Sequence, residues 1–281
     1  MSARNITFVP SLVLLLSIAL ASGNIALGGV LDPNYPRGFW RFDEGQGYTA
    51  YDSSGYGNHG TVYGASWTTG ISGSALHFTG GTTADRVEVP DSPSLRIVDC
   101  LGLDAWVKPD INIEPNHPWS YNIIMKWHGS GDQWRTGYLL TIGTSKECGN
   151  LSCLYLLLGF GNGNYRAFNS TKDSWNAGQW YHIAATYDSS LSSGNVKLYV
   201  DGVLDTSYGE TRSIATNDLP LFINSDPYEV DAGAPSPSVR YFPGVIDEAR
   251  VIPEPATLSL LALGGLAALR RRSGLLLRRR K

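Results

Sequence analysis

Paired carboxylates are the side chains most able to cut a glycosidic bond, because a retaining glycosidase holds two of them about 5 Å apart. Glu229 and Asp231 come nearest to such a pair, since alternate residues of a strand share a face. Prolines and glycines surround them, which predicts a loop instead of a strand. The adjacent Asp247 and Glu248 would point to opposite faces. The sequence also has no G-x-S-x-G elbow, phosphate-binding loop or H-E-x-x-H spacing, so we predict a non-catalytic protein.

Aromatic side chains are frequent in the middle of the chain, and they are Trp119, Tyr121, Trp127, Trp134 and Tyr165. Exposed rings can stack on sugar rings, whereas buried rings fill the space in and between sheets. Both roles are open for each of these residues. Our predicted ligand-binding residues are Trp119, Tyr121, Trp134 and Tyr165.

Cysteine spacing permits one short disulfide. Cys148 and Cys153 flank the sequence Gly-Asn-Leu-Ser, which is typical of a turn between strands, so their side chains can meet across a hairpin. Cys100 is then left over. A metal site is a weaker interpretation of this pair, because no further ligands stand at a suitable spacing. For His77 and His182, an ordinary position in a sheet is favoured over a ligand role.

The elements that must position these residues are strands. Residues 180–187 alternate between two faces, and residues 196–200 repeat the pattern. Asp201 and Gly202 follow at once, and this pair is typical of a two-residue hairpin turn. Short apolar segments at residues 39–42, 74–78 and 86–89 indicate further strands, with Pro90 ending the last of them. The 281 residues are compatible with one large all-β domain or two small ones, and we favour one.

Charge is unevenly distributed along the chain. The formal net charge is −3, but eight of the 22 basic residues lie before residue 22 or after residue 255. Without them, 14 basic residues face 25 acidic ones, a net charge of −11 for residues 22–255. An acidic body argues against nucleic acid as a partner and is compatible with cations or neutral sugars.

The N-terminus has the pattern of a secretory signal. A basic Arg4 precedes an apolar run, and the small-x-small triplet at residues 19–21 predicts cleavage after Ala21. We therefore assign residues 1–21 to a signal peptide and residues 22–37 to a linker. A retained membrane anchor is the alternative, and either one exports the body.

A set of segments over residues 38–252 resembles the laminin-G-like domain of the concanavalin A-like lectin and glucanase superfamily. The segments are, in order, FWRFDEG, YDSSGYGNHGTV, SGSALHF, VEVPDSPSL, LDAWVKP, WYHIAATYD, VKLYVDGVLD and FPGVIDEARV. The resemblance implies an all-β, antiparallel two-sheet jelly-roll sandwich whose first and last strands are close partners. It does not fix an activity, because one fold hosts many functions.

The resemblance also bears on metal and active-site chemistry. Glucanases of this superfamily carry two carboxylates on one strand in an E-x-D-x-E pattern, which is missing here. The family often binds calcium, and hard oxygen donors suit that ion. The resemblance therefore places a Ca²⁺ site at Asp43, Asp52 and Asp247. Solvated carboxylates at the end of a sheet are the alternative.

The C-terminus resembles the PEP-CTERM sorting signal of Gram-negative bacteria. The resemblance consists of Pro253, Glu254 and Pro255, an apolar helix over residues 256–269 and a basic cluster. Fourteen helical residues span about 21 Å against a hydrocarbon core of about 30 Å. The resemblance implies that exosortase, a membrane protease-transpeptidase, removes the tail over residues 253–281 after a transient stay in the inner membrane. A single-pass anchor is the alternative.

These observations predict an exported protein of the cell surface or extracellular matrix that binds a glycan or a matrix component without catalysis. Two alternatives remain open. One is a structural exopolysaccharide or biofilm matrix protein without a discrete ligand, and the other is a glycoside hydrolase with an unrecognised site.

Overall fold

The computed structural model describes residues 36–80, 85–118, 120–128, 135–144, 149, 151–224 and 239–253. All of these belong to the second of two compact units, Pro33–Lys281. The predicted leader over residues 1–21 and the predicted helix over residues 256–269 lie outside the described residues. Among the residues that are described, no helix is both long and apolar enough to cross a membrane.

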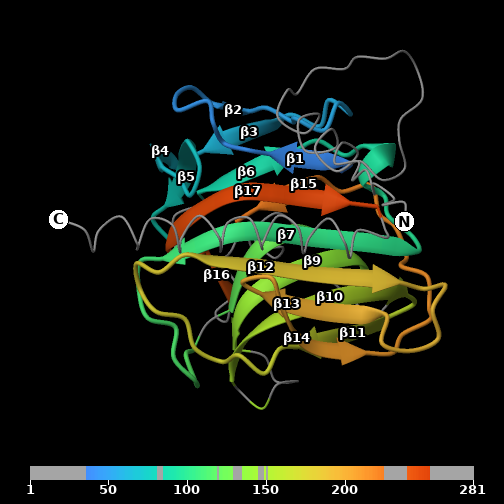
Figure 1. The fold of residues 1–281 in the computed structure, drawn as a ribbon. Coiled ribbons are helices and arrows are strands. Elements are labelled where there is room, and N and C mark those ends of the chain that lie inside the picture. The colour runs from blue at the N-terminus through green and yellow to red at the C-terminus, as the bar shows by residue number, and fades with distance from the viewer. Residues whose placement is uncertain are drawn as a thin grey trace, which may run out of the picture. The chain divides into compact units, whose positions relative to one another are not determined.

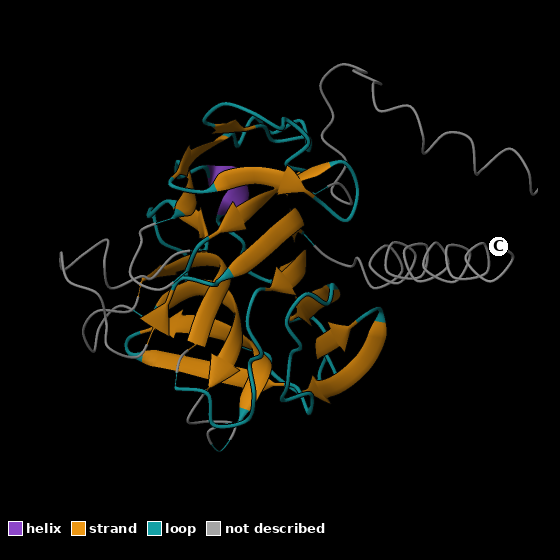
Figure 2. Cartoon of the chain, turned by 90° about the vertical axis from the view of Figure 1, so that its left-hand side faces the viewer, coloured by secondary structure: helices purple, strands orange, loops and turns teal. Residues whose placement is uncertain are grey.

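Two β-sheets make up the architecture (Figure 1). Sheet A has the order β14 (Val203–Tyr208), β13 (Val196–Val200), β12 (Tyr181–Asp188), β7 (Cys100–Pro109), β17 (Gly244–Ile252), β5 (Ser74–Phe78) and β4 (Ser66–Thr69), with β1 (Gly38–Trp40) pairing with β17. Sheet B has the order β11 (Asn164–Asn169), β10 (Ser152–Gly161), β9 (Thr136–Thr144), β8 (Ser120–His128), β15 (Leu221–Ile223), β6 (Arg86–Val89), β3 (Gly60–Tyr63) and β2 (Thr49–Ala50), with β16 (Val239–Arg240) pairing with β8. The β16 pair is parallel and the other strand pairs are antiparallel. Apart from the 3-10 turn Pro93–Leu95, the described chain consists of strands and loops (Figure 2).

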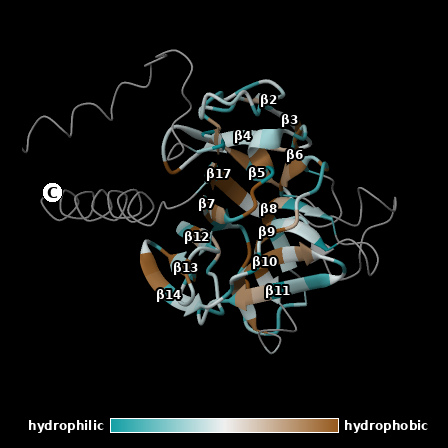
Figure 3. Cartoon of the chain, turned by 90° about the vertical axis from the view of Figure 1, so that its right-hand side faces the viewer, coloured by the Kyte–Doolittle hydropathy of each residue, from teal (hydrophilic) through white to brown (hydrophobic). Residues whose placement is uncertain are grey.

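A single large hydrophobic core fills the space between the inner faces of the sheets. In β12 the side chains of Tyr181, Ile183, Ala185 and Tyr187 belong to this core. Central strands such as β17, β5 and β10 accordingly carry much of the hydrophobic colour in Figure 3. The two-sheet antiparallel sandwich predicted from the sequence is confirmed, and so is the alternation over residues 180–187.

The predicted hairpin turn is present between β13 and β14. Asp201 and Gly202 have φ values of 51° and 77°, the left-handed conformations that a type I′ turn requires at both central positions. The Asp201 carboxylate accepts a hydrogen bond from the His182 amide at 2.9 Å, which ties the turn to β12.

The first and last strands are partners, as predicted, with Gly38 opposite Val251 and Trp40 opposite Ala249. Strand β1 is shorter than the segment 39–42 predicted from the sequence. It ends at Trp40, and Phe42 adopts a φ of 56° with its side chain buried. The ring of Phe42 nevertheless lies in the core, together with that of Trp40.

Candidate functional site

The outer face of sheet B carries an aromatic row that crosses four strands. Strand pairing sets Trp127 of β8 opposite Gly137 of β9, Gly137 opposite Gly159 of β10, and Gly159 opposite Tyr165 of β11. With two glycines between them, the outer rings reach across and meet edge to face, with centroids 6.5 Å apart. Tyr165 is 38% exposed and Trp127 is buried, so Tyr165 is the ring that a ligand reaches first.

The glycines of this row are required by close backbone contacts. A Cβ atom at Gly137 would lie 1.9 Å from the Lys126 carbonyl oxygen, and one at Gly159 would lie 2.4 Å from the Arg135 carbonyl oxygen. Gly137 also has a φ of 92°, which side chains rarely allow. The guanidinium carbon of Arg135 lies 4.2 Å from the centroid of the Tyr165 ring. The row therefore ends in a cation–π pair at the edge of the sheet.

Two further rows complete this part of the face. Beside the aromatic row, Met125 pairs with Phe222 and Leu139, and Leu139 pairs with Leu157. The next row is polar, with Thr141 of β9 opposite Asn122 and Tyr155. The Thr141 hydroxyl donates to the Asn122 side-chain oxygen at 3.0 Å. Aromatic, apolar and polar side chains thus lie in adjacent rows on this face of the sheet, and Tyr165 is the exposed one among those named.

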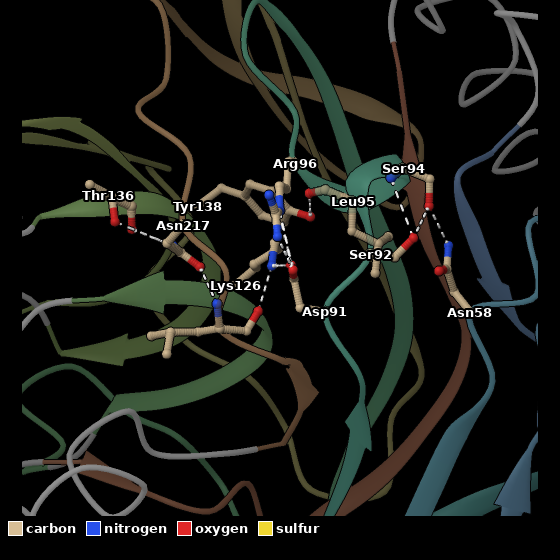
Figure 4. A network of polar contacts seen from close by, with 11 residues as sticks. Asn58, Asp91, Ser92, Ser94, Leu95, Arg96, Lys126, Thr136, Tyr138 and Asn217 are labelled. Carbon is tan, nitrogen blue, oxygen red and sulfur yellow. Dashed lines mark hydrogen bonds and ion pairs between the residues drawn. The ribbon is translucent and has the colours of Figure 1, made fainter.

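A buried network supports the strand ends from which Trp127 and Arg135 emerge (Figure 4). The Lys126 ammonium donates to the Asp91 carboxylate at 2.6 Å and to the Leu219 carbonyl. Arg96 pairs with the same carboxylate. Asn217 donates to the carbonyl and hydroxyl oxygens of Thr136, the residue after Arg135. The network fixes the residues next to Trp127 and Arg135 and thereby the positions of both side chains.

Burial and ion pairing shift the pKa values of the charged groups in this network in opposite directions. Burial lowers the pKa of the Lys126 ammonium, and the Asp91 carboxylate opposes that effect. The hydrogen bond from Arg96 lowers the pKa of Asp91. The buried Tyr138 hydroxyl donates to the Leu95 carbonyl at 2.9 Å, and burial raises its pKa. Asp91 is thus held ionised between the two cations Lys126 and Arg96.

The other predicted ligand-binding aromatics do not join this row among the described residues. Tyr121 is only 2% exposed and belongs to the core, where its ring meets Phe242 with centroids 6.0 Å apart. The prediction that Tyr121 binds a ligand is therefore corrected, because its side chain lies on the inner face of β8. Trp119 and Trp134 lie outside the described residues.

Asp52, one of the three predicted calcium ligands, serves its own loop. One carboxylate oxygen accepts hydrogen bonds from the Phe39 amide at 2.9 Å and the Ser54 amide at 2.8 Å. The other accepts from the Ser54 hydroxyl at 2.7 Å and the Asn58 amide at 2.9 Å. Each oxygen already has two donors, so Asp52 is engaged within its own loop, and its role as a calcium ligand stays a prediction.

Asp43 and Asp247 flank the turn between β4 and β5. A Cβ atom at Gly73 would touch Asp43, and one at Gly70 would touch Asp247. The buried Asp247 carboxylate accepts hydrogen bonds from the amides of Ile71 at 2.8 Å and Glu248 at 2.8 Å, and burial raises its pKa to about 7. Within the described ranges, no three acidic, histidine or cysteine side chains converge closely enough to hold a metal ion.

The predicted disulfide between Cys148 and Cys153 stays a prediction, because Cys148 lies outside the described residues. Cys153 is buried on β10, opposite Gly143 of β9. Its sulfur lies 3.7 Å from the Asn169 side-chain oxygen. Cys100 is partly buried at the start of β7, with its sulfur 3.6 Å from an Asp188 carboxylate oxygen.

The outer face of sheet A contains a different cluster. Asp104 of β7 is fully buried and lies 2.9 Å from the Arg250 guanidinium and 3.1 Å from His182 Nε2. His182 and Arg250 are also buried. The histidine is thus satisfied within the sheet, as the sequence favoured, and its Nδ1 atom has no hydrogen-bond partner in the described part of the chain.

Comparison with protein families identifies the fold. Residues 80–259, more than half of the chain, match the model of the concanavalin A-like lectin/glucanases superfamily. The chain belongs to this superfamily. Residues 251–273 match the PEP-CTERM protein-sorting motif, which indicates an exported protein that is processed at the membrane.

Solved structures with this concanavalin A-like fold include domain 4 of AbnA, an extracellular arabinanase of Geobacillus stearothermophilus in complex with arabinotriose. It is 19% identical with a TM-score of 0.55, over 83% of this chain and 100% of that one. The binding domain of botulinum neurotoxin serotype G is 17% identical with a TM-score of 0.58, over 82% and 51%. This chain thus spans about half of that binding domain, and such identities show the fold alone. No curated protein matches the chain.

Sequence reasoning about this concanavalin A-like chain missed Arg135 and the two glycines of the aromatic row. Arg135 stands in a loop segment without an obvious pattern. Gly137 and Gly159 carried a usable signal, because a glycine inside an apolar strand often marks the close approach of another backbone. The signal becomes specific only once strand register places the glycines opposite one another.

Proposed function

We propose that this protein is an exported, non-catalytic domain that binds a glycan or another matrix component through the outer face of sheet B. The observation that carries the proposal is the row of Trp127, Gly137, Gly159 and Tyr165. Its glycines let the Trp127 and Tyr165 rings approach each other across β9 and β10, and the exposed Tyr165 ring offers a flat apolar surface. The C–H faces of a sugar ring suit such a surface.

The carboxylates of this face support a binding role over hydrolysis. Glu88 of β6 is the one carboxylate on the described strands of the outer face of sheet B, and it pairs with Arg86 at 3.2 Å. Glycoside hydrolysis requires two carboxyl groups on either side of the bond that breaks. AbnA domain 4, which has the same fold, was solved with arabinotriose bound, and this also supports recognition of a glycan.

The proposed destination is the cell surface or extracellular matrix of a Gram-negative bacterium. The sorting motif supports removal of the tail by exosortase near Pro253, which directly follows β17. Mass spectrometry of the mature protein checks this step. A C-terminus within residues 253–255 is expected, and an intact arginine-rich end contradicts processing.

We further propose a calcium ion beside the turn between β4 and β5, where Asp43 and Asp247 would contribute two of its ligands. Asp43 is exposed and Asp247 is buried. Carboxylate oxygens are the ligands that Ca²⁺ prefers, and the ion would supply the positive charge these groups lack. Thermal unfolding with and without a chelator tests the site. A lower midpoint in chelator is expected, and an unchanged midpoint excludes a structural ion.

Glycan-array binding of the purified protein tests the central proposal. Saturable retention of at least one sugar class is expected, together with about tenfold weaker binding by Tyr165→Ala, as loss of a stacking contact worth about 1.4 kcal/mol implies. Tyr48→Ala is the matched control, because Tyr48 is 81% exposed and precedes β2 on the opposite edge of sheet B. Absence of retention on every glycan, or equal loss in both variants, contradicts the proposal.

A further inference from the structure

Three arginines lie near the β11 edge of the sandwich, and two of them pair with one glutamate. Arg212 pairs with Glu210 at 2.7 Å, and Arg166 approaches the same carboxylate at 3.5 Å. The hydrogen bond from Arg212 lowers the pKa of Glu210 to about 2, so this carboxylate stays ionised. Arg166 and Arg212 are therefore engaged within the protein.

Arg135 is different, because no carboxylate of the described chain pairs with it. It is half-buried, and its guanidinium lies over the Tyr165 ring at 4.2 Å. A guanidinium stacked on an aromatic ring uses its flat face, so the N–H donors along its edge remain available. The structure thus holds an arginine in place next to the proposed sugar-stacking ring, with no carboxylate partner among the described residues.

The body around this cation is acidic overall, so any binding of an anion here depends on Arg135 itself. Residues 22–255 carry a net charge of −11, so the body as a whole repels polyanions. A planar guanidinium fork matches the two oxygens of a carboxylate. We propose that the glycan bound at the outer face of sheet B is acidic, with the carboxylate of a uronic-acid residue held by Arg135 and a sugar ring stacked on Tyr165. This inference rests on the glycan-binding function proposed above.

Paired probes test the inference. Isothermal titration of the purified protein uses oligosaccharides of galacturonic, mannuronic and glucuronic acid, each beside its carboxyl-reduced neutral counterpart. At least one acidic oligosaccharide is expected to bind tenfold or more tightly than its neutral counterpart. The acidic preference is expected to weaken as salt rises, because a charge pair is screened.

Substitutions assign the preference to one residue. Arg135→Gln is expected to bring the acidic-to-neutral ratio close to one, and Arg135→Lys, which keeps the charge without the fork, to give an intermediate ratio. Arg37→Gln is the matched control. Arg37 stacks on Tyr56 at 4.7 Å, so this variant loses the same charge and the same kind of contact elsewhere. Circular dichroism verifies that each variant is folded.

The outcomes separate this inference from the function on which it rests. Equal binding of acidic and neutral forms, or an unchanged ratio in Arg135→Gln, overturns the acidic assignment and leaves glycan binding standing. Binding of neither form of any probe or of any arrayed glycan overturns both.

Discussion

On the outer face of sheet A, Asp104 lies between Arg250 and His182, and all three side chains are buried. On the outer face of sheet B, Tyr165 is partly exposed, and Arg135 stacks on it without a carboxylate partner in the described chain. Both faces combine aromatic and charged side chains on neighbouring strands. Of these two groups, only Arg135 lacks a carboxylate partner in the described chain.

The buried cluster around Asp104 is expected to contribute to stability, whereas the pair of Arg135 and Tyr165 is available for binding. A buried charge that already has its partners has nothing left to offer a ligand, and it costs free energy to disturb. A half-buried cation on a ring contributes little to folding and keeps its donors for an outside anion. Function in this sandwich is therefore expected where the charges are incompletely paired.

The largest expected effect is on sheet A. Asp104→Leu leaves Arg250 buried without its carboxylate, and we expect a loss of about 3–5 kcal/mol in the free energy of unfolding. Urea denaturation measures it. The double variant Asp104→Leu with Arg250→Met is expected to recover much of the loss. A loss below about 1 kcal/mol in the single variant Asp104→Leu would show that the pair of Asp104 and Arg250 contributes little to the free energy of unfolding.

Glu210 tests how much the paired arginines contribute to the free energy of unfolding. Its folded-state pKa of about 2 lies below the ordinary value of 4.5, so its contribution is present above pH 4.5 and is lost as the pH falls toward 2. We expect Glu210→Gln to reduce stability at pH 6 by about 2–3 kcal/mol relative to wild type, and to match wild type near pH 2. Denaturant titrations across this range test it, and a constant difference at all pH values contradicts it.

Lys126 is a buried charge, like those on sheet A, and it also supports Trp127 in the candidate site. Lys126→Met removes the hydrogen bond to the Leu219 carbonyl but leaves Asp91 paired with Arg96, so we expect a loss of about 1–2 kcal/mol. Lys197→Met on β13 is the control, and its cost should stay within about 0.5 kcal/mol. Equal losses in the two variants would argue against the network.

The smallest expected effect on stability is at the candidate site. Tyr165→Ala should change the free energy of unfolding by less than about 1 kcal/mol, because the ring is partly exposed and lies on an edge strand. Thermal and urea unfolding check this value. A larger loss would mean that Tyr165 is part of the scaffold, and the contrast between the two faces would then fail.

Much of the scaffold could be predicted because its signals are local. The alternation over residues 180–187 and the Asp201–Gly202 turn predict their own conformations, since side-chain period and left-handed backbone are properties of neighbouring residues. The prediction for Tyr121 rested on the abundance of aromatic residues in the middle of the chain, and composition does not distinguish a ring that faces the core from an exposed one.

By itself the sequence determined the alternating strands, the turns, the acidic body and the sorting motif at its end. The tertiary structure decided which residues of distant strands lie opposite one another. It brought Trp127, Gly137, Gly159 and Tyr165 into one row, and it paired Arg212 with Glu210 while leaving Arg135 on a ring. The physical reason is that strand register and charge pairing arise between segments far apart in the chain, where no local pattern specifies the partner.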